Sequence, residues 1–587
     1  MVKQLMKSIR EFKLATILTP TFVIGEVIIE ALIPFLISLL INDIKAGCDL
    51  SVILGYAWKL VALSLLSLLC GYLAGIYCAK ASTGFARNLR YDIFTNIQKF
   101  SFSNIDKFSS ASLVTRLTTD IQNVQMAFMM IIRTAVRAPL NLIFSFTMAY
   151  IMGGTMAVIF LIIIPFLGIG LYLIVRSVMP IFKKGFPLFD KITRIVEENV
   201  KGIRVVKSFV REDFEINKFD ETSNDIRKMF TRAEQIIALN NPLMQISIYA
   251  VMLFVLMFGS EMIIKTNATS LDVGQLSTLM TYGFQIMVSL MMLSMVFVMI
   301  TFSEESSKRI VEVLNEKSSI TSKENTITEV KDGSIDFDHV RFKYSPTAER
   351  PVLENIDVHI KSGETIGIIG GTGSAKSSFV QLIPRLYDVT EGIVRVGKED
   401  VRDYDLVTLR DSVAMVLQKN VLFSGTIADN IRWGNKDATL EEVKHVCHLA
   451  CADEFIEQMP DGYDTWIEQG GTNVSGGQKQ RLCIARALLK QPKILIMDDS
   501  TSAVDTKTDA IIRKAMKEYI PETTKIIIAQ RTSSVEDADR IIVLDGGKID
   551  AIGTSEELLK TNQIYREVYL SQNKQGTEEI VEEGGVR

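Results

Sequence analysis

A run of small and polar residues follows an apolar segment in the second half of the chain and has the composition of a phosphate-binding loop. The apolar segment is 365–369, and the run is Gly370, Gly371, Thr372, Gly373, Ser374, Ala375, Lys376, Ser377 and Ser378. Backbone N–H groups of such a loop and of the helix after it can surround phosphate oxygens, and the lysine adds positive charge. The pattern predicts a strand, a loop and a helix that bind a nucleotide.

A second apolar segment, 494–497, ends in the carboxylates Asp498 and Asp499. A carboxylate at the end of a buried strand is a typical ligand for the magnesium that accompanies nucleotide phosphates. Between the two segments lies the run Ser475, Gly476, Gly477 and Gln478, and two further short segments, 501–505 and 528–531, follow Asp499.

These segments, in this order and at these spacings, resemble the nucleotide-binding domain of an ABC transporter. The resemblance implies that ATP and Mg²⁺ are the cofactors. It implies that Tyr344 stacks on adenine, that Lys376 contacts the terminal phosphates, and that the amides of 371–378 hold phosphate oxygens. It assigns Ser377 and Gln418 to magnesium and makes Asp498 the carboxylate of the acidic strand.

Three residues depart from the family pattern. Ala375 stands where the phosphate loop has its last glycine, a position whose backbone angles an alanine tolerates poorly. Asp499 stands where working sites carry a glutamate that orients the attacking water, and a carboxylate withdrawn by about an ångström can cost on the order of 10²-fold in rate. Gln530 replaces a histidine that would contact the terminal phosphate, and its amide cannot become a cation.

By contrast, the signature run 475–478 is intact. In this family two nucleotide domains meet head to tail, so that each ATP lies between one domain's phosphate loop and the other domain's signature. We therefore predict a heterodimer: the site on this chain turns ATP over slowly or not at all, and the site that it completes on a second, non-identical half-transporter is the working one. The alternatives are a homodimeric peptide or lipid exporter with two slow sites, and a regulatory ATP-binding subunit that gates or scaffolds without pumping.

The composition indicates a membrane protein with a soluble domain. Hydrophobic residues make up 48% of the 587 residues, mean hydropathy is +0.23, and the apolar excess precedes residue 305. The net charge of −4 argues against nucleic acid as the main partner. We expect an all-α transmembrane domain at 1–310, a linker at 311–333, an α/β nucleotide-binding domain at 334–573 and an acidic disordered tail at 574–587.

Six apolar segments are long enough to span the membrane, each with about 20 helical residues or more: 14–42, 52–79, 128–153, 155–178, 236–264 and 274–303. The long connections 80–127 and 179–235 are basic, which places them and both termini in the cytosol of a multi-pass cytoplasmic-membrane protein. We expect them to form helical hairpins. By resemblance, short coupling helices lie at their tips, near 104–111 and 211–219. An Asn267-Ala268-Thr269 glycosylation pattern would face outward, although an unmodified loop is the simpler interpretation.

Polar and soft side chains inside the spans bear on the substrate. Glu26 and Glu30 share one helix face. They either contact cationic substrates or form a gate, or they are a protonated or hydrogen-bonded pair that merely packs. Arg133 and Arg137, near the cytosolic end of the third span, would extend toward lipid headgroups, and the alternative is that they line a cavity. The last two spans are rich in methionine, which suits a site for varied apolar molecules but also ordinary packing. By resemblance the substrates are amphipathic drugs or lipids. His445, Cys447, His448 and Cys451 share a helix, to which we assign no metal.

Overall fold

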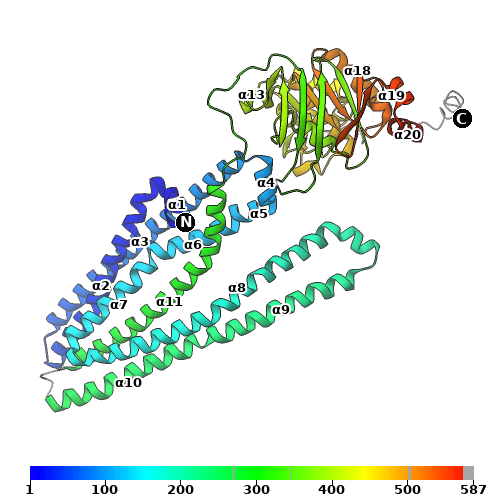
Figure 1. Ribbon diagram of the computed structural model, residues 1–587. Helices are drawn as coiled ribbons and strands as arrows, with labels where there is room; N and C mark the ends of the chain where they lie inside the picture. Colours follow the sequence, from blue (N-terminus) through cyan, green and yellow to red (C-terminus); the bar gives the residue numbers. More distant parts are fainter. Residues whose placement is uncertain (267–268, 270, 346, 500–503, 573–587) are drawn as a thin grey trace. The chain divides into compact units, whose positions relative to one another are not determined.

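The structure is a computed structural model that describes residues 1–266, 269, 271–345, 347–499 and 504–572 (Figure 1). Residues 267 and 268, residues 501–503 of the motif after Asp499, and the predicted tail at 574–587 lie outside the described residues. The chain divides into two compact units, 1–99 with 108–316, and 100–107 with 317–587. Each unit is described separately.

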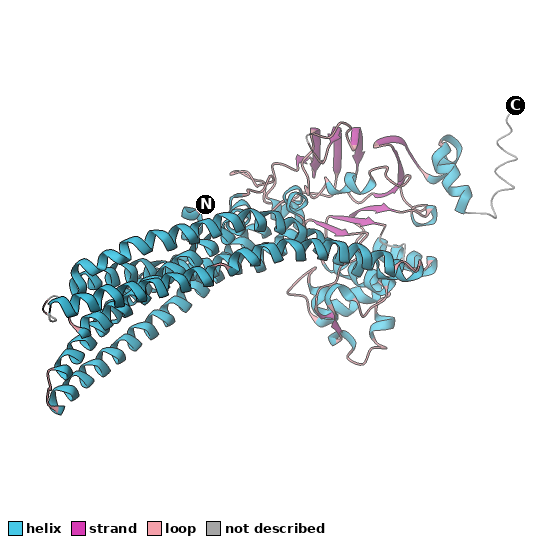
Figure 2. Ribbon diagram, turned by 90° about the horizontal axis from the view of Figure 1, so that it is seen from below, coloured by secondary structure: helices cyan, strands magenta, loops and turns pink. Residues whose placement is uncertain are grey.

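The described part of the first unit is helical, and most of its residues lie in long α-helices (Figure 2). Five apolar helical stretches of its described residues are long enough to cross a membrane. One of them, Ser110–Ser208, contains several successive α-helices, and the chain reverses between the last two of these, at Gly154, where φ is +54° (Figure 1). The expectation of an all-helical membrane domain is confirmed. Its helices are α1 (Val2–Met6), α2 (Lys13–Lys45), α3 (Leu50–Gln98), α5 (Ser110–Thr115), α6 (Ile121–Ile132), α7 (Thr134–Gly153), α8 (Val158–Ser208), α9 (Glu212–Ala238), α10 (Asn240–Thr266) and α11 (Val273–Asn315).

The two long connections are helical, but they end differently. A short helix, α4 (Phe102–Phe108), overlaps the first expected coupling segment. The second expected short helix, at 211–219, is wrong: the chain turns at 209–211, and 212–219 is the beginning of the continuous helix α9. No glycine or proline interrupts 212–238, and three acidic residues favour a helix start in the first turn, so the helix has no reason to break there.

The second unit is an α/β domain with a central six-stranded sheet of order β12-β11-β3-β10-β9-β6. Strands β11, β3, β10, β9 and β6 run parallel, and β12 pairs antiparallel at the edge. A four-stranded sheet, β2-β1-β4-β5, packs its apolar residues into the same core. The strands are β1 (Ile335–Phe342), β2 (Leu353–Ile360), β3 (Thr365–Ile369), β4 (Glu391–Val396), β5 (Glu399–Asp400), β6 (Val413–Val416), β7 (Gly425–Thr426), β8 (Trp466–Ile467), β9 (Ile494–Asp498), β10 (Thr524–Ile528), β11 (Arg540–Asp545) and β12 (Lys548–Gly553).

The helices of this unit are mostly short. They are α12 (Lys376–Gln381), α13 (Leu406–Asp411), α14 (Ile427–Arg432), α15 (Leu440–Leu449), α16 (Asp453–Ile456), α17 (Gly476–Leu489), α18 (Thr506–Tyr519), α19 (Ser555–Thr561) and α20 (Gln563–Gln572). Helices α14, α15, α16 and α17 share one apolar core with strands β6 and β9. The expected α/β class of this half is confirmed.

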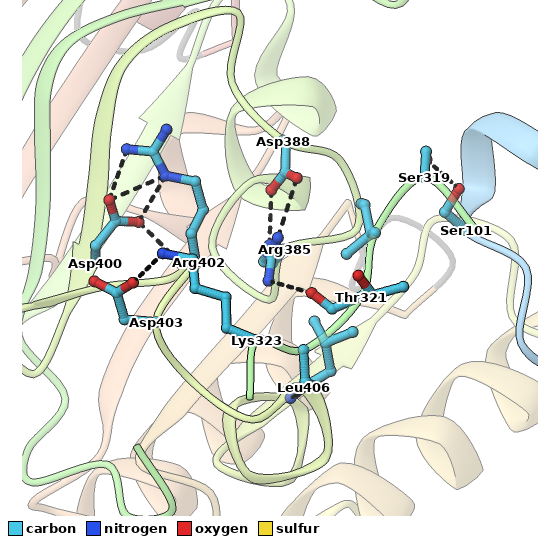
Figure 3. A network of polar contacts seen from close by, with 12 residues as sticks. Ser101, Ser319, Thr321, Lys323, Arg385, Asp388, Asp400, Arg402, Asp403 and Leu406 are labelled. Atoms are coloured by element: carbon cyan, nitrogen blue, oxygen red, sulfur yellow. Dashed lines mark hydrogen bonds and ion pairs between the residues drawn. The ribbon is translucent and has the colours of Figure 1, made fainter. Parts of the chain in front are cut away.

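Polar contacts fix the segment that leads into this domain (Figure 3). Ser101 and Ser319 share a hydroxyl hydrogen bond of 2.7 Å. Farther along, Lys323 pairs with Asp403, and Arg385 donates to the carbonyl of Thr321 at 3.4 Å. Residues 317–323 are therefore attached to the nucleotide domain rather than loose.

Candidate nucleotide-binding site

The topology brings the predicted site residues together. Strands β3, β10, β9 and β6 are neighbours and parallel, so their carboxyl ends meet at one edge of the sheet. The loop 370–375 follows β3, and Gln530 follows β10. Asp498 is the last residue of β9 and Asp499 comes directly after it, while Gln418 follows β6. Ligands of open α/β sheets bind at this edge.

The loop after β3 reaches helix α12 through a strained residue. Ala375 lies in the left-handed region, with φ 71° and ψ 22°, directly before Lys376. Gly373, at φ +86°, has open space where a Cβ would stand. Side-chain-bearing residues avoid this region at a cost of roughly 1–2 kcal/mol. Alanine in place of the family's glycine at position 375 therefore strains the backbone, and a glycine would avoid this strain.

Lys376 points back over this loop. Its Nζ donates to the carbonyl oxygens of Gly370 at 2.8 Å and Gly371 at 2.9 Å. Burial lowers the pKa of the ammonium group, and the nearby carboxylates of Asp498 and Asp499 oppose that shift. The cation is thus held at the mouth of the loop, where phosphate oxygens could replace the carbonyls as its partners.

Asp498 is buried at the end of β9, with 6% of its surface exposed. Burial raises the pKa of its carboxyl group, and a hydrogen bond from the Ser377 side chain partly counters this effect. A buried carboxylate that touches a hydroxyl is a donor set suited to a hard cation, which prefers oxygen ligands. The two side chains fit the magnesium site expected from the sequence.

Asp499 is bound by two amides. Gln530 Nε2 donates to Asp499 Oδ2 at 2.8 Å, and Gln418 Nε2 donates to the same oxygen at 3.3 Å. Asp499 has a positive φ of 48°, which aspartate accepts better than most residues. Two glutamines that the sequence singled out separately are thus joined through one carboxylate oxygen.

The adenine-stacking candidate Tyr344 is half exposed, beyond the end of β1, and its hydroxyl group shares a hydrogen bond of 2.8 Å with Ser378 of α12. Its ring meets that of Tyr387 edge-on, with centroids 5.0 Å apart. The Tyr387 hydroxyl donates to Asp106 of α4 at 2.9 Å. Sequence reasoning missed Tyr387, because nothing in its neighbourhood in the chain indicates the contact with Tyr344.

The signature run starts helix α17. Ser475 is the N-cap: its Oγ accepts from the N–H of Gln478 at 3.3 Å, and Gln478 Oε1 accepts from the N–H of Ser475 at 2.8 Å. Ser475 and Gly476 are exposed. Gly476 and Gly477 are the first two residues of this helix, so their N–H groups have no acceptor within the helix and lie at its positive end.

Ionisable side chains in the membrane unit form a cluster. Arg137 of α7 donates to Glu26 at 2.9 Å and to Glu30 at 2.6 Å, both on α2. The expectation that Arg137 extends to lipid headgroups is wrong, because the two carboxylates attract it across the helix interface. The two glutamates are thus hydrogen-bonded to Arg137, as the packing interpretation requires.

The chain matches two protein families over most of its length. Residues 16–310 match the ABC transporter transmembrane region, and residues 353–502 match the ABC transporter domain. A solved structure of a bacterial Atm1-family ABC exporter with ATP bound has a TM-score of 0.82 and 24% identity, and the match covers 96% of this chain and 98% of that chain.

Curated relatives match along almost the whole chain. An uncharacterized ABC transporter ATP-binding protein, YfiB of Bacillus subtilis, is 34% identical over 554 residues, which cover 94% of this chain and 96% of the relative. An ATP-dependent lipid A-core flippase of Photobacterium profundum is 30% identical over 521 residues, which cover 86% of this chain and 88% of the flippase.

Proposed function

Because this chain belongs to the ABC transporters, as a half-transporter of the exporter type with one membrane domain and one nucleotide-binding domain, we propose that it works as the catalytically weak half of a heterodimeric exporter in the cytoplasmic membrane. Its own nucleotide site holds ATP with little turnover. Its signature run completes the hydrolytic site of a non-identical partner chain. Both termini and the nucleotide domain face the cytosol.

The state of Asp499 carries this proposal. A residue that orients and deprotonates an attacking water needs a free carboxylate oxygen close to the γ-phosphate. Asp499 Oδ2 already accepts two amide hydrogen bonds. The aspartate side chain is also one methylene shorter than that of the glutamate expected at this position. Gln530, as one of those donors, is turned toward Asp499 and offers no ionisable proton.

Nucleotide binding itself is well supported on this chain. Mg²⁺, when bound with ATP, neutralises phosphate charge, and the residues suited to hold it are Ser377, Asp498 and Gln418. Lys376 and the amides of the loop hold phosphate oxygens, and Tyr344 gives adenine a ring to stack on. These residues bind and orient the nucleotide, whereas the water-activating position is occupied by the amide-bound Asp499.

The N–H groups of Gly476 and Gly477 at the start of α17 support the second half of the proposal. A helix N-terminus with free N–H groups is a phosphate-binding feature, and this one is exposed. The γ-phosphate held by the partner's loop would lie against these amides. The partner then has to supply the glutamate and the histidine that this chain lacks.

The proposed substrates are amphipathic molecules or lipids that leave the cytosol or the inner leaflet. The relatives include the lipid A-core flippase, and α8, α10 and α11 enclose apolar space within the membrane unit. ATP binding would close the two nucleotide domains and open the membrane cavity outward, and hydrolysis at the partner's site would reset it.

Co-expression of this chain with its partner half tests the proposal. Ser475→Ala should abolish the ATPase activity and dye efflux of the assembled transporter, because it damages the working site. Asp499→Asn should leave both within about twofold. The proposal fails if Ser475→Ala leaves efflux unchanged, if Asp499→Asn abolishes it, or if the chain alone hydrolyses ATP briskly as a symmetric dimer. A partner-dependent ATPase without efflux would favour the regulatory alternative.

A further inference from the structure

An apolar cavity of about 300 Å³ in the membrane unit is lined by residues of α8, α9, α10 and α11. Figure 1 shows where these four helices run. Helix α8 provides Val178 and Phe182 among others, and α11 provides Met291, Met292 and Met295. A second apolar cavity of about 250 Å³ shares Val175 and Ser294 with it and continues between α8 and α11. The first cavity has the size at which small-molecule sites begin.

One polar group of this cavity has no partner. Asn240, the first residue of α10, lines the cavity, and its Oδ1 is buried without a hydrogen bond. A buried amide oxygen without a partner costs roughly 1–3 kcal/mol. A ligand that donates a hydrogen bond to Asn240 would recover this loss. The surrounding residues are mostly apolar and offer few other donors.

The remaining lining residues restrict the charge of the ligand. Apart from Asn240 and Ser294 they are aliphatic residues, methionines and Phe182, and none is ionisable. A charged ligand would therefore be buried without a counter-charge, which is costly in a membrane-embedded site. Flexible methionine side chains adapt to flat or irregular apolar bodies.

We propose that this cavity binds a neutral amphipathic molecule with an apolar ring body and one N–H or O–H donor, which Asn240 Oδ1 accepts. This inference rests on the proposed export function and names its substrate class. The cavity lies toward the end of the apolar parts of α8, α10 and α11 that leads into the α8–α9 hairpin, on the side predicted to face the cytosol, so entry from the inner leaflet follows.

The test uses the full-length chain in lipid nanodiscs without nucleotide, so that it does not depend on hydrolysis or on the partner. The probes are 1-aminoanthracene and anthracene, which differ by one amine donor, and binding is read from probe fluorescence after subtraction of empty nanodiscs. Asn240→Leu should weaken 1-aminoanthracene about tenfold, or 1.4 kcal/mol, and leave anthracene within about twofold. Asn241→Leu, at the exposed neighbour, is the matched control and should change neither.

A second pair of variants tests the cavity itself. Met292→Trp fills the cavity and should abolish saturable binding of both probes, whereas Met257→Trp, at an exposed position of α10 outside the cavity, should not. Unchanged preference for 1-aminoanthracene in Asn240→Leu would overturn the role of Asn240. Wild-type binding in Met292→Trp would overturn the site. If the probes bind as predicted but the chain alone hydrolyses ATP as a symmetric dimer, the proposed division of labour is refuted. The proposed binding site then still stands.

Discussion

Gln530 Nε2 donates a hydrogen bond of 2.8 Å to Asp499 Oδ2. The two residues that replace the family's glutamate and histidine therefore bind each other. A glutamate and a histidine at these positions would place a longer carboxylate and an ionisable ring there. The combined variant Asp499→Glu with Gln530→His should therefore raise hydrolysis at this site, on the order of 10²-fold if the lost ångström of reach is the main defect.

The measurement is the ATPase rate of the assembled transporter in a Ser475→Ala background, which on our proposal silences the partner's site. Adding Lys376→Ala to the combined variant is the control and should remove the gained activity. A rate that stays at the Ser475→Ala background would show that Asp499 and Gln530 are not what limits this site.

The strain at Ala375 predicts a gain from glycine. At φ 71° the alanine is held in a left-handed conformation that glycine adopts freely, so Ala375→Gly should stabilise the nucleotide domain by about 1 kcal/mol. Thermal unfolding of the purified chain measures this effect. Gly373→Ala, at φ +86° on the same loop, should shift the midpoint in the opposite direction. A lower midpoint for Ala375→Gly would contradict the strain.

The buried Asp498 carboxyl predicts a pH dependence. Its pKa is raised by burial, so the folded state keeps a proton that the unfolded state has lost, and stability falls as pH rises from the ordinary aspartate value of about 4 through the folded pKa. Asp498→Asn should therefore stabilise the nucleotide-free chain at pH 7.5, and the difference should shrink toward pH 4.

Thermal midpoints across this pH range check the effect, with Asp545→Asn, at an exposed position at the end of β11, as the control. Asp498→Asn should also lose the additional stabilisation that Mg²⁺ gives with ATP. A variant less stable than wild type at pH 7.5 would show that burial is not the dominant influence on this carboxyl group.

The Arg137 cluster predicts that losing Arg137 alone costs more stability than losing all three charges together. Arg137→Met leaves Glu26 and Glu30 without their cation in a largely buried place, and breaking such a pair costs about 3–5 kcal/mol. Arg137→Met combined with Glu26→Gln and Glu30→Gln removes all three charges and should recover most of the loss. Midpoints of thermal unfolding in detergent distinguish the two. Equal losses in both variants would indicate that the packing of Arg137, not its charge, matters.

Much of the nucleotide site could be predicted from the sequence because its residues follow apolar segments. In a parallel sheet such residues meet at one edge whatever the details of packing, so Lys376, Asp498 and Gln530 could be assigned to one place. The pairing of Arg137 could not, because it depends on how α2 and α7 rotate against each other. The contact between Tyr344 and Tyr387 depends in the same way on long-range packing.

The continuous start of α9 illustrates a different limit. The expected short helix at 211–219 came from family resemblance, whereas the local sequence contains no residue that would break the helix after Glu212. Local propensity was the better guide there. At Ala375 the family resemblance and the local backbone agree. The family has a glycine at this position, and the backbone here is left-handed, a conformation that glycine adopts freely.

Vanadate trapping with 8-azido-ATP in the assembled two-chain transporter tests the division of labour most directly, because vanadate retains nucleotide only at a site that has hydrolysed it. On our proposal, photolabel should appear on the partner chain, whose phosphate loop would face Ser475 of this chain, and it should disappear with Ser475→Ala. Equal labelling of both chains, or labelling of this chain alone, would contradict the proposal that the site around Lys376 and Asp499 is the weak one.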